Sequence, residues 1–332
     1  MDRLRKIRIV VCIVTLLVAG MGGATGASAT GPTNADALKA APYRQIISLY
    51  GAHTENLLAM GAGPQLIGID RQSTGLPGAA GKPVFSYHDD PERFLAARPD
   101  LVLIRPMIAR GYPRLVERLV RSDIRVVSLQ PTTVEALAGY WQTLGELCGQ
   151  ADAAAHMTRT FDTAVAAFKA LSATVTTPKR VYFEAIHSKM KTFTPQAMAA
   201  FALETAGGIN VATDAPVRAN NNIAIYGKER LLSHAADIDV FLSQQGAMNR
   251  ITREAIMAEP GFGVIKAVKT HQVFLVDETV VSRPTLRLIE GIYRIGSLLY
   301  PEVYTEAGRR ILADAGLPEG IPSRSGCKGG SY

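Results

Sequence analysis

A short phrase occurs twice in this chain and constrains its fold more than any other feature. Residues 92–95 (Glu-Arg-Phe-Leu) precede the apolar run 101–104, and residues 229–232 (Glu-Arg-Leu-Leu) precede the apolar run 238–242. Each copy is typical of a short helix that leads into a buried strand. Because the copies are far apart with a long helical pattern between them, the sequence predicts two similar α/β lobes, each with a glutamate at the start of an equivalent helix.

The first 29 residues have the three parts of a secretory signal peptide. Four basic residues at positions 3–8 precede an apolar run from Ile9 to Ala19, and small residues follow up to Ala29. The apolar run is shorter than the ~20 residues that a membrane-spanning helix needs, which favours cleavage near Ala29 over an uncleaved anchor. The sequence therefore predicts an exported, periplasmic protein in which residues 30–43 form a flexible leader.

The charge of the chain is mild and evenly spread. The formal net charge of +7 falls to +4 when the four basic residues and one acidic residue of segment 1–29 are removed. Nucleic-acid binders concentrate Lys and Arg on one face, and the sequence has no such block, so no nucleic-acid partner is expected. Cys148 and Cys327 are the cysteines left after cleavage, and the sequence leaves open whether they form a disulfide.

The order of the predicted elements gives the domain boundaries. From residue 44 onward short apolar strands alternate with helices, which predicts central, mostly parallel sheets. An N-terminal lobe is expected at 44–148, a C-terminal lobe at 177–321 and a loose tail at 322–332. Apolar residues recur at helical spacing from Met157 to Leu171 without Pro or Gly. One long rigid helix within 149–176 is therefore expected to join the lobes, with a ligand cleft between them.

Four motifs carry a family resemblance. They are the opening strand and helix at 46–63, residues 98–103 (Arg-Pro-Asp-Leu-Val-Leu), residues 206–211 (Ala-Gly-Gly-Ile-Asn-Val), and 267–269 with 272–274. In this order they resemble the periplasmic substrate-binding proteins of ABC importers for iron-siderophore complexes, haem and cobalamin. The resemblance implies a monomeric receptor whose partners are a small-molecule metal chelate, an inner-membrane ABC permease and its ATPase. It also implies that Glu92 and Glu229 dock on permease arginines, although each can simply favour a helix dipole.

The position of the ligand follows from the predicted sheets. In open α/β sheets ligands bind beyond the carboxyl ends of the strands, so residues directly after the expected strands are candidates. Arginines there suit an anionic ligand and tyrosines suit a flat one, but both are also ordinary surface or packing residues. The candidate ligand contacts are Tyr50, His53, Tyr87, His88, Arg105, Met107, Arg110, His187, Met190, Asn221 and Arg283.

Three of these candidates are also possible metal ligands. His53, His88 and His187 can bind a first-row metal, or haem iron beside a tyrosine, if their loops converge. Against this, His53 can cap a helix that begins near Thr54, and no tight metal-binding spacing is present. Met107 and Met190 favour packing over thioether ligation. The lone tryptophan, Trp141, is expected in the core, which weakens cobalamin as the ligand.

The sequence favours a binding protein over an enzyme. It has no G-x-S-x-G, H-E-x-x-H or P-loop motif, and it requires no resident cofactor. A ferric siderophore is the first expected ligand, with haem, cobalamin or a free first-row metal as alternatives. An exported hydrolase is the alternative from another functional class.

Overall fold

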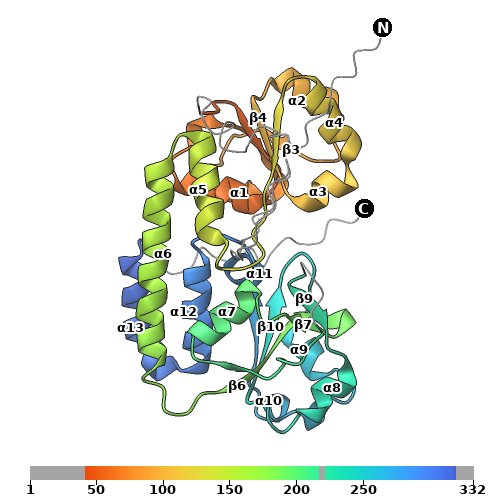
Figure 1. Cartoon of the computed structure of the whole chain (residues 1–332). Helices are drawn as coiled ribbons and strands as arrows, with labels where there is room; N and C mark the ends of the chain where they lie inside the picture. Colours follow the sequence, from red (N-terminus) through yellow and green to blue (C-terminus); the bar gives the residue numbers. More distant parts are fainter. Residues whose placement is uncertain (1–41, 217–220, 319–332) are drawn as a thin grey trace, which may run out of the picture. The chain divides into compact units, whose positions relative to one another are not determined.

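The computed structural model describes residues 42–216 and 221–318. The expected signal peptide, nearly all of the leader and the 322–332 tail lie outside these residues. The chain divides into two compact units (Figure 1). The first comprises the residues up to Pro131 together with Ala138–His156, and the second comprises Thr132–Leu137 and the residues from Met157 onward.

A five-stranded parallel sheet forms the centre of the first unit. Its strand order is β3-β2-β1-β4-β5, so the chain starts in the middle and moves outward in both directions. Every residue of β4 is buried, as expected for a strand covered on both faces. The strands are β1 (Ile46–Ser48), β2 (Leu66–Asp70), β3 (Val84–Phe85), β4 (Leu101–Ile104) and β5 (Arg125–Ser128).

Local capping interactions and prolines define where helices of the first unit begin. Asp90 caps α2 by accepting a hydrogen bond from the backbone N–H of Glu92, and Pro91 occupies the first helical position. Phe94 of this helix is fully buried in the core of the unit with Val102 and Leu119. The helices are α1 (Gly51–Ala59), α2 (Pro91–Ala97), α3 (Pro106–Gly111), α4 (Pro113–Arg121) and α5 (Leu137–Cys148), with 3-10 turns η2 (Gly63–Gln65) and η3 (Arg71–Ser73).

The second unit is built on a mixed six-stranded sheet. Its order is β11-β10-β6-β7-β9, and β8 pairs in parallel with the start of β6. β10 is parallel to β6 and β11, whereas β7 is antiparallel to β6 and β9. The strands are β6 (Arg180–Ile186), β7 (Lys191–Phe193), β8 (Ile209–Asn210), β9 (Ile223–Ile225), β10 (Val240–Gln245) and β11 (Val273–Asp277).

The helices of the second unit cover an aromatic core that contains Tyr182, Phe241 and Phe262. The longest is α6, which covers Ala151–Ser172 inside the range expected for a joining helix. The boundary between the two units, at His156 and Met157, falls within α6. The other elements are α7 (Met198–Thr205), α8 (Lys228–Ser233), α9 (Arg253–Met257), α10 (Lys266–Lys269), α11 (Glu278–Val281), α12 (Leu288–Leu299), α13 (Pro301–Asp314), η4 (His187–Lys189) and η5 (Phe262–Val264).

The duplicated phrase occupies the same place in both units. It forms α2 before β4 and α8 before β10, and each of these strands lies beside the first strand of its sheet, β1 or β6. The third residue of each phrase, Phe94 or Leu231, is fully buried, whereas Glu92 and Glu229 are exposed. The prediction of two similar α/β lobes is therefore confirmed, and the second sheet is mixed because of the β7 and β9 strands.

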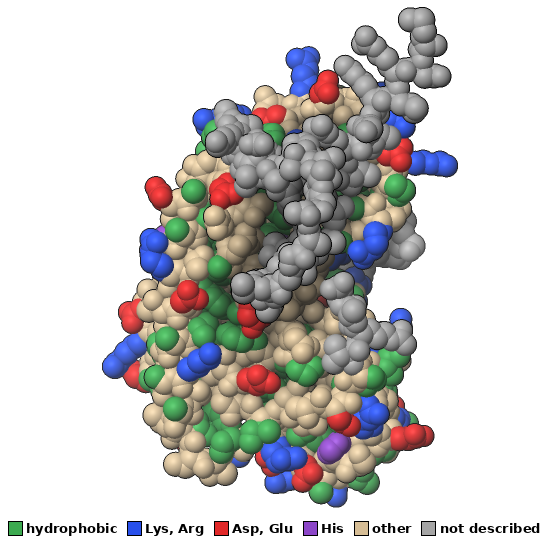
Figure 2. Space-filling model, in the orientation of Figure 1, with side chains coloured by type: hydrophobic (Ala, Val, Ile, Leu, Met, Phe, Trp, Pro, Cys, Tyr) green, Lys and Arg blue, Asp and Glu red, His purple; other side chains and the backbone are tan. Residues whose placement is uncertain are grey.

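Three further features concern membrane-spanning helices, surface charge and the cysteines. Within residues 42–216 and 221–318, no helix combines the length and apolarity needed to cross a membrane. On the face drawn in Figure 2, the Lys and Arg side chains are interspersed with Asp and Glu and form no single basic block. The possible disulfide stays a prediction, because Cys148 is a buried free thiol here and Cys327 lies outside the described residues.

Candidate functional site

An aromatic cluster lies beyond the carboxyl ends of the strands in the first unit. Tyr87 and His88 follow β3, and Tyr112 separates α3 from α4. The ring centroids of Tyr87 and Tyr112 are 4.8 Å apart, and those of Tyr87 and His88 are 4.5 Å apart. The Tyr112 hydroxyl is 3.2 Å from His88 Nδ1. His88 is exposed and both tyrosines are half-buried, so the cluster offers ring faces, phenols and an imidazole at the surface.

A cation–π pair lies beyond the neighbouring strands β1 and β4. Arg105, directly after β4, places its guanidinium carbon 5.1 Å from the centroid of the Tyr50 ring. Both residues are half-buried. A guanidinium on a ring face keeps its N–H donors in its own plane, where they can still bind a carboxylate or phosphate. Tyr50 and Arg105 therefore stay candidate contacts for an anionic, flat ligand.

His53 differs from these neighbours because it is fully buried inside the unit. Helix α1 begins at Gly51 rather than near Thr54, so His53 lies in its first turn and does not cap it. Its Nε2 donates to the carbonyl of Ile104 at 3.1 Å, and its Nδ1 is 2.7 Å from the Tyr140 hydroxyl. The carbonyl can only accept, so Nε2 carries the proton and Nδ1 accepts from Tyr140. With both nitrogens engaged, the expected ligand contact by His53 does not fit the structure.

Burial gives His53 a predictable effect on stability. Desolvation lowers the pKa of its imidazole to about 4, and the nearby Arg105 charge acts in the same direction. In the unfolded chain His53 binds a proton near pH 6.5, so between pH 6.5 and 4 the unfolded state binds more protons than the native state. We expect this residue alone to lower the free energy of unfolding by about 3 kcal/mol on acidification across that window.

The measurement is urea unfolding at several pH values for the native chain and a His53→Gln variant. Glutamine keeps an N–H donor for the Ile104 carbonyl and does not titrate. The difference between the two stability curves should therefore shrink as the pH falls from 6.5 to 4. Parallel curves would show that His53 is not a buried neutral imidazole.

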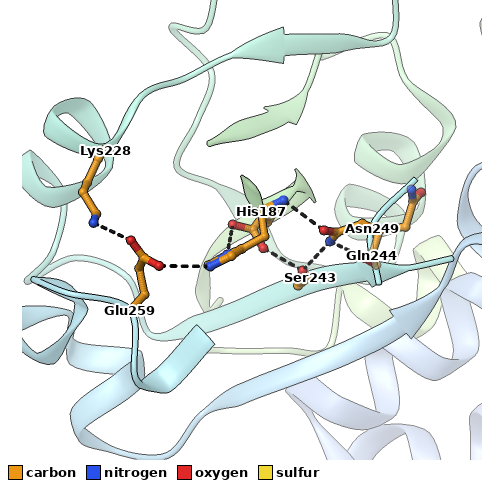
Figure 3. Close-up of polar contacts among 7 residues, drawn as sticks. His187, Lys228, Ser243, Gln244, Asn249 and Glu259 are labelled. Carbon is orange, nitrogen blue, oxygen red and sulfur yellow. Dashed lines mark hydrogen bonds and ion pairs between the residues drawn. The ribbon is translucent and has the colours of Figure 1, made fainter. Parts of the chain in front are cut away.

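A polar network lies at the carboxyl end of β6 in the second unit (Figure 3). Glu184 is completely buried, and its two carboxylate oxygens accept from His187 Nδ1 at 2.9 Å and from the Ser243 hydroxyl at 2.7 Å. Asn249 accepts from the His187 backbone N–H at 3.0 Å and donates to Ser243 Oγ and the Gln244 carbonyl. These contacts fix the turn after β10 against the turn after β6.

His187 lies between two carboxylates in this network. Its Nδ1 contacts Glu184, and its Nε2 is 3.5 Å from Glu259 Oε2. The hydrogen bond to Glu184 is the main cause that raises the pKa of His187, and the charge of Glu259 adds to it, against the opposing effect of burial. Glu259 also pairs with Lys228, which holds the pKa of the Glu259 carboxyl below its usual range. Because Nδ1 and Nε2 both face carboxylates, His187 does not offer a free ring nitrogen to a metal.

The three histidines do not form the metal cage considered from the sequence. His53 and His187 have both ring nitrogens engaged, and only His88 is exposed. No group of three His, Cys, Asp or Glu side chains suited to a metal ion occurs among residues 42–216 and 221–318. Direct binding of a free first-row metal by these histidines is therefore not supported by the geometry.

The remaining candidates are dispersed. Met107 and Met190 are half-buried and pack against the cores of their own units, as their expected packing role requires. Arg283 is 3.7 Å from Glu278 and largely buried, so its guanidinium already has an internal partner. Asn221 is exposed and accepts from the Ile223 backbone N–H at the start of β9. Arg110 is exposed in the last turn of α3.

The two glutamates of the duplicated phrase lie on the surface in equivalent first turns. Glu92 is 65% exposed and pairs with Arg118 of α4 at 2.7 Å. Glu229 is exposed and directly follows Lys228 at the start of α8. Because β3 precedes α2 and β9 precedes α8, each helix begins on the carboxyl-end side of its own sheet. This placement is shared by the two units and does not depend on how they are arranged.

Comparison with known proteins identifies the family to which this architecture belongs. A family model described as periplasmic binding protein matches residues 46–280, most of the chain. The chain belongs to the periplasmic binding protein family. A Bacillus subtilis relative, an uncharacterised ABC transporter substrate-binding lipoprotein, is 22% identical over 279 residues, which cover 79% of this chain and 82% of the relative. The family resemblance drawn from the motifs is thus confirmed.

Solved structures show the same fold. A possible iron-binding, periplasmic solute-binding protein from Staphylococcus epidermidis superposes with a TM-score of 0.67 at 22% identity, covering 78% of this chain and 100% of that chain. A periplasmic haem-binding protein from Roseiflexus sp. RS-1 has a TM-score of 0.65 at 19% identity, covering 80% and 99%. Because the family consists of substrate-binding proteins, the prediction that this chain is not an enzyme is confirmed.

Several site residues were not identified from the sequence. Tyr112 was missed because it lies between two helices and follows no strand. The signal for the second network was present, since Glu184 interrupts the apolar strand Val181–Ile186 and a buried carboxylate needs a partner. Glu259 and Lys228 carry no such signal, because neither interrupts a predicted strand.

Proposed function

We propose that this protein is an extracytoplasmic receptor that captures an iron chelate and delivers it to an ABC permease and its ATPase. The observation that carries the proposal is the Tyr87, His88 and Tyr112 cluster at the carboxyl edge of the first sheet. It provides flat aromatic faces with polar tips, and Arg105 adds a positive charge beyond a nearby strand of the same sheet. We take the receptor to act as a monomer in the periplasm, without nucleic acid.

Two chelate classes fit this surface, and the sequence favoured a ferric siderophore. A siderophore that encloses its iron would use the rings for stacking and Arg105 for its negative charge. Haem is the second candidate, because its iron keeps axial positions that a tyrosinate or an imidazole can fill. Tyr87 and His88 offer both donors side by side, which a siderophore would leave unused. Several proteins of the same fold are named as haem-binding.

Other ligands receive less support from the chain. Trp141 is fully buried in α5, and the carboxyl-edge loops contain no tryptophan to cover a corrin ring. A free metal would need the histidine cluster that the described residues do not form. Cobalamin and free metal are therefore secondary to the two iron chelates.

The absorption spectrum and iron content of the protein isolated from a periplasmic extract test the proposal. A Soret band with about one iron per tetrapyrrole would identify haem, and a charge-transfer band without a Soret band would identify a ferric siderophore. The matching compound should stabilise the ligand-free protein and so raise its unfolding temperature. At a concentration a hundredfold above Kd, the free energy of unfolding should increase by about 2.7 kcal/mol. If neither class stabilises the protein, the iron-chelate proposal fails.

A further inference from the structure

The turn that carries His187 also holds the start of α8. After His187 the chain forms η4 and then Met190, whose backbone has a positive φ of 45°. The Met190 carbonyl accepts hydrogen bonds from the backbone N–H groups of Tyr226 and Gly227, both at 3.0 Å. These are the two residues immediately before α8. One short segment therefore joins the carboxyl end of β6 to the helix that presents Glu229.

A second connection runs through side chains. Glu259 uses one carboxylate oxygen to contact His187 Nε2 at 3.5 Å and the other to bind the Lys228 ammonium at 2.5 Å (Figure 3). Lys228 is the first residue of α8, and Glu229 is the next. Phe262 packs against both cations, with its ring 5.9 Å from the His187 ring and 5.6 Å from the Lys228 ammonium. The two cations thus share one carboxylate and one aromatic ring.

The charges of this chain alternate. Glu184, His187, Glu259 and Lys228 follow one another, so each carboxylate lies beside a basic group, and His187 adds a positive charge when its ring is protonated. Loss of a proton from His187, or its diversion to a ligand, would leave the buried Glu184 and the partly exposed Glu259 with one cation fewer. Glu259 would then depend on Lys228 alone. A change at the strand end therefore changes the force on the first turn of α8.

We propose that Glu259 is a positioning residue that couples His187, at the carboxyl end of β6, to the first turn of α8 and so to Glu229. The inference deepens the proposed delivery to the permease, and it rests on Glu229 as the docking residue that the family resemblance implies. The coupling element lies entirely within the second unit. It gives the protein a physical route by which events at the carboxyl edge of the sheet alter the surface offered to the permease.

The test follows the titration of His187 by NMR in the isotopically labelled exported protein without ligand. The groups that face His187 are Glu184 from β6 and Glu259 from the segment before η5, with neutral Asn249 and Phe262 beside it. In the native chain, the chemical shifts of the Glu229 and Asn249 backbone amides should both change with pH. The midpoint of each change should match that of the His187 ring signals.

Two variants and one control decide the result. In Glu259→Gln, Asn249 should still follow His187, whereas the Glu229 amide should lose the shift at that midpoint. Lys228→Met keeps the Glu259 carboxylate and should also abolish the shift of the Glu229 amide. It provides a second measurement if Glu259→Gln unfolds. Glu254→Gln removes an exposed carboxylate from α9 of the same region and should retain both shifts. The coupling would be overturned if the Glu229 amide shift did not change at the His187 midpoint in the native chain. It would also be overturned if that change persisted in both variants.

A second readout separates this inference from the docking proposal. With saturating haem or ferric siderophore, whichever stabilises the protein, Glu259→Gln should lower the ATPase stimulation of the reconstituted transporter, and Glu254→Gln should not. If the NMR coupling is present but Glu229→Lys leaves stimulation unchanged, docking through Glu229 is wrong and the coupling stands. If Glu229→Lys abolishes stimulation while the NMR coupling is absent, docking stands and the coupling is wrong.

Discussion

Reversing the charge of Glu92 and Glu229 together, to Lys, is expected to abolish delivery to the permease while ligand binding in solution stays intact. Both carboxylates are exposed in equivalent first turns, where they can meet arginines of a partner without desolvating a core. Like charges at an interface cost several kcal/mol, so about 2 kcal/mol at each glutamate weakens the docked complex roughly a thousandfold. Uptake by whole cells and ATPase stimulation in proteoliposomes measure this loss.

The effect on folding should be small by comparison. The exposed Glu92–Arg118 pair contributes about 0–1 kcal/mol, and the helix dipole at each N-terminus contributes about 0.3–1 kcal/mol. A matched control reverses Glu146 in α5 and Glu306 in α13, which changes the net charge equally in each unit but leaves the duplicated phrase intact. If this control also loses uptake, the effect is due to net charge. If the Glu92 and Glu229 variant loses ligand binding, these glutamates contact the ligand instead of the permease.

The parts of the fold that could be predicted from the sequence are those set by local periodicity. Phe94 and Leu231 are apolar residues of the duplicated phrase, and they lie on the buried side of α2 and α8. The β7 and β9 strands could not be predicted in the same way. They are three residues each, and residues 194–222 separate them, so their pairing depends on non-local contacts.

The site shows the same division. Sequence position placed Tyr50, Tyr87, His88 and Arg105 correctly beyond strand ends, because parallel strands share one carboxyl edge. It could not distinguish the fully buried His53 from these neighbours, which are half-buried or exposed. The start of α1 at Gly51 turns His53 toward Tyr140, a residue 87 positions away, and no local pattern encodes that contact. The position of His187 after a strand likewise suggests a metal ligand, because the sequence does not show that its ring nitrogens face Glu184 and Glu259.

Replacing Tyr87 should have the largest effect on ligand binding, and the two replacements Tyr87→Phe and Tyr87→Ala distinguish the two iron chelates. If the ligand is haem bound through the Tyr87 phenol, phenylalanine removes the iron donor and should weaken binding on the order of tenfold to a hundredfold with a changed Soret position. If the ligand is a siderophore stacked on the ring, phenylalanine should bind nearly as well as tyrosine. Alanine should then lose about 1 kcal/mol of ring contact or more.

The control for these variants is Tyr43→Phe. Tyr43 precedes β1, so it lies at the amino edge of the sheet, opposite the edge that carries the cluster. Removing its hydroxyl should leave the titration of ligand unchanged for either chelate. Tyr112→Phe adds the complementary measurement, because Tyr112 supports His88 through its hydroxyl at 3.2 Å and packs on Tyr87 through its ring. A phenylalanine there keeps the packing, so a spectral change in Tyr112→Phe without one in Tyr87→Phe would move the iron donor from Tyr87 to the His88–Tyr112 pair.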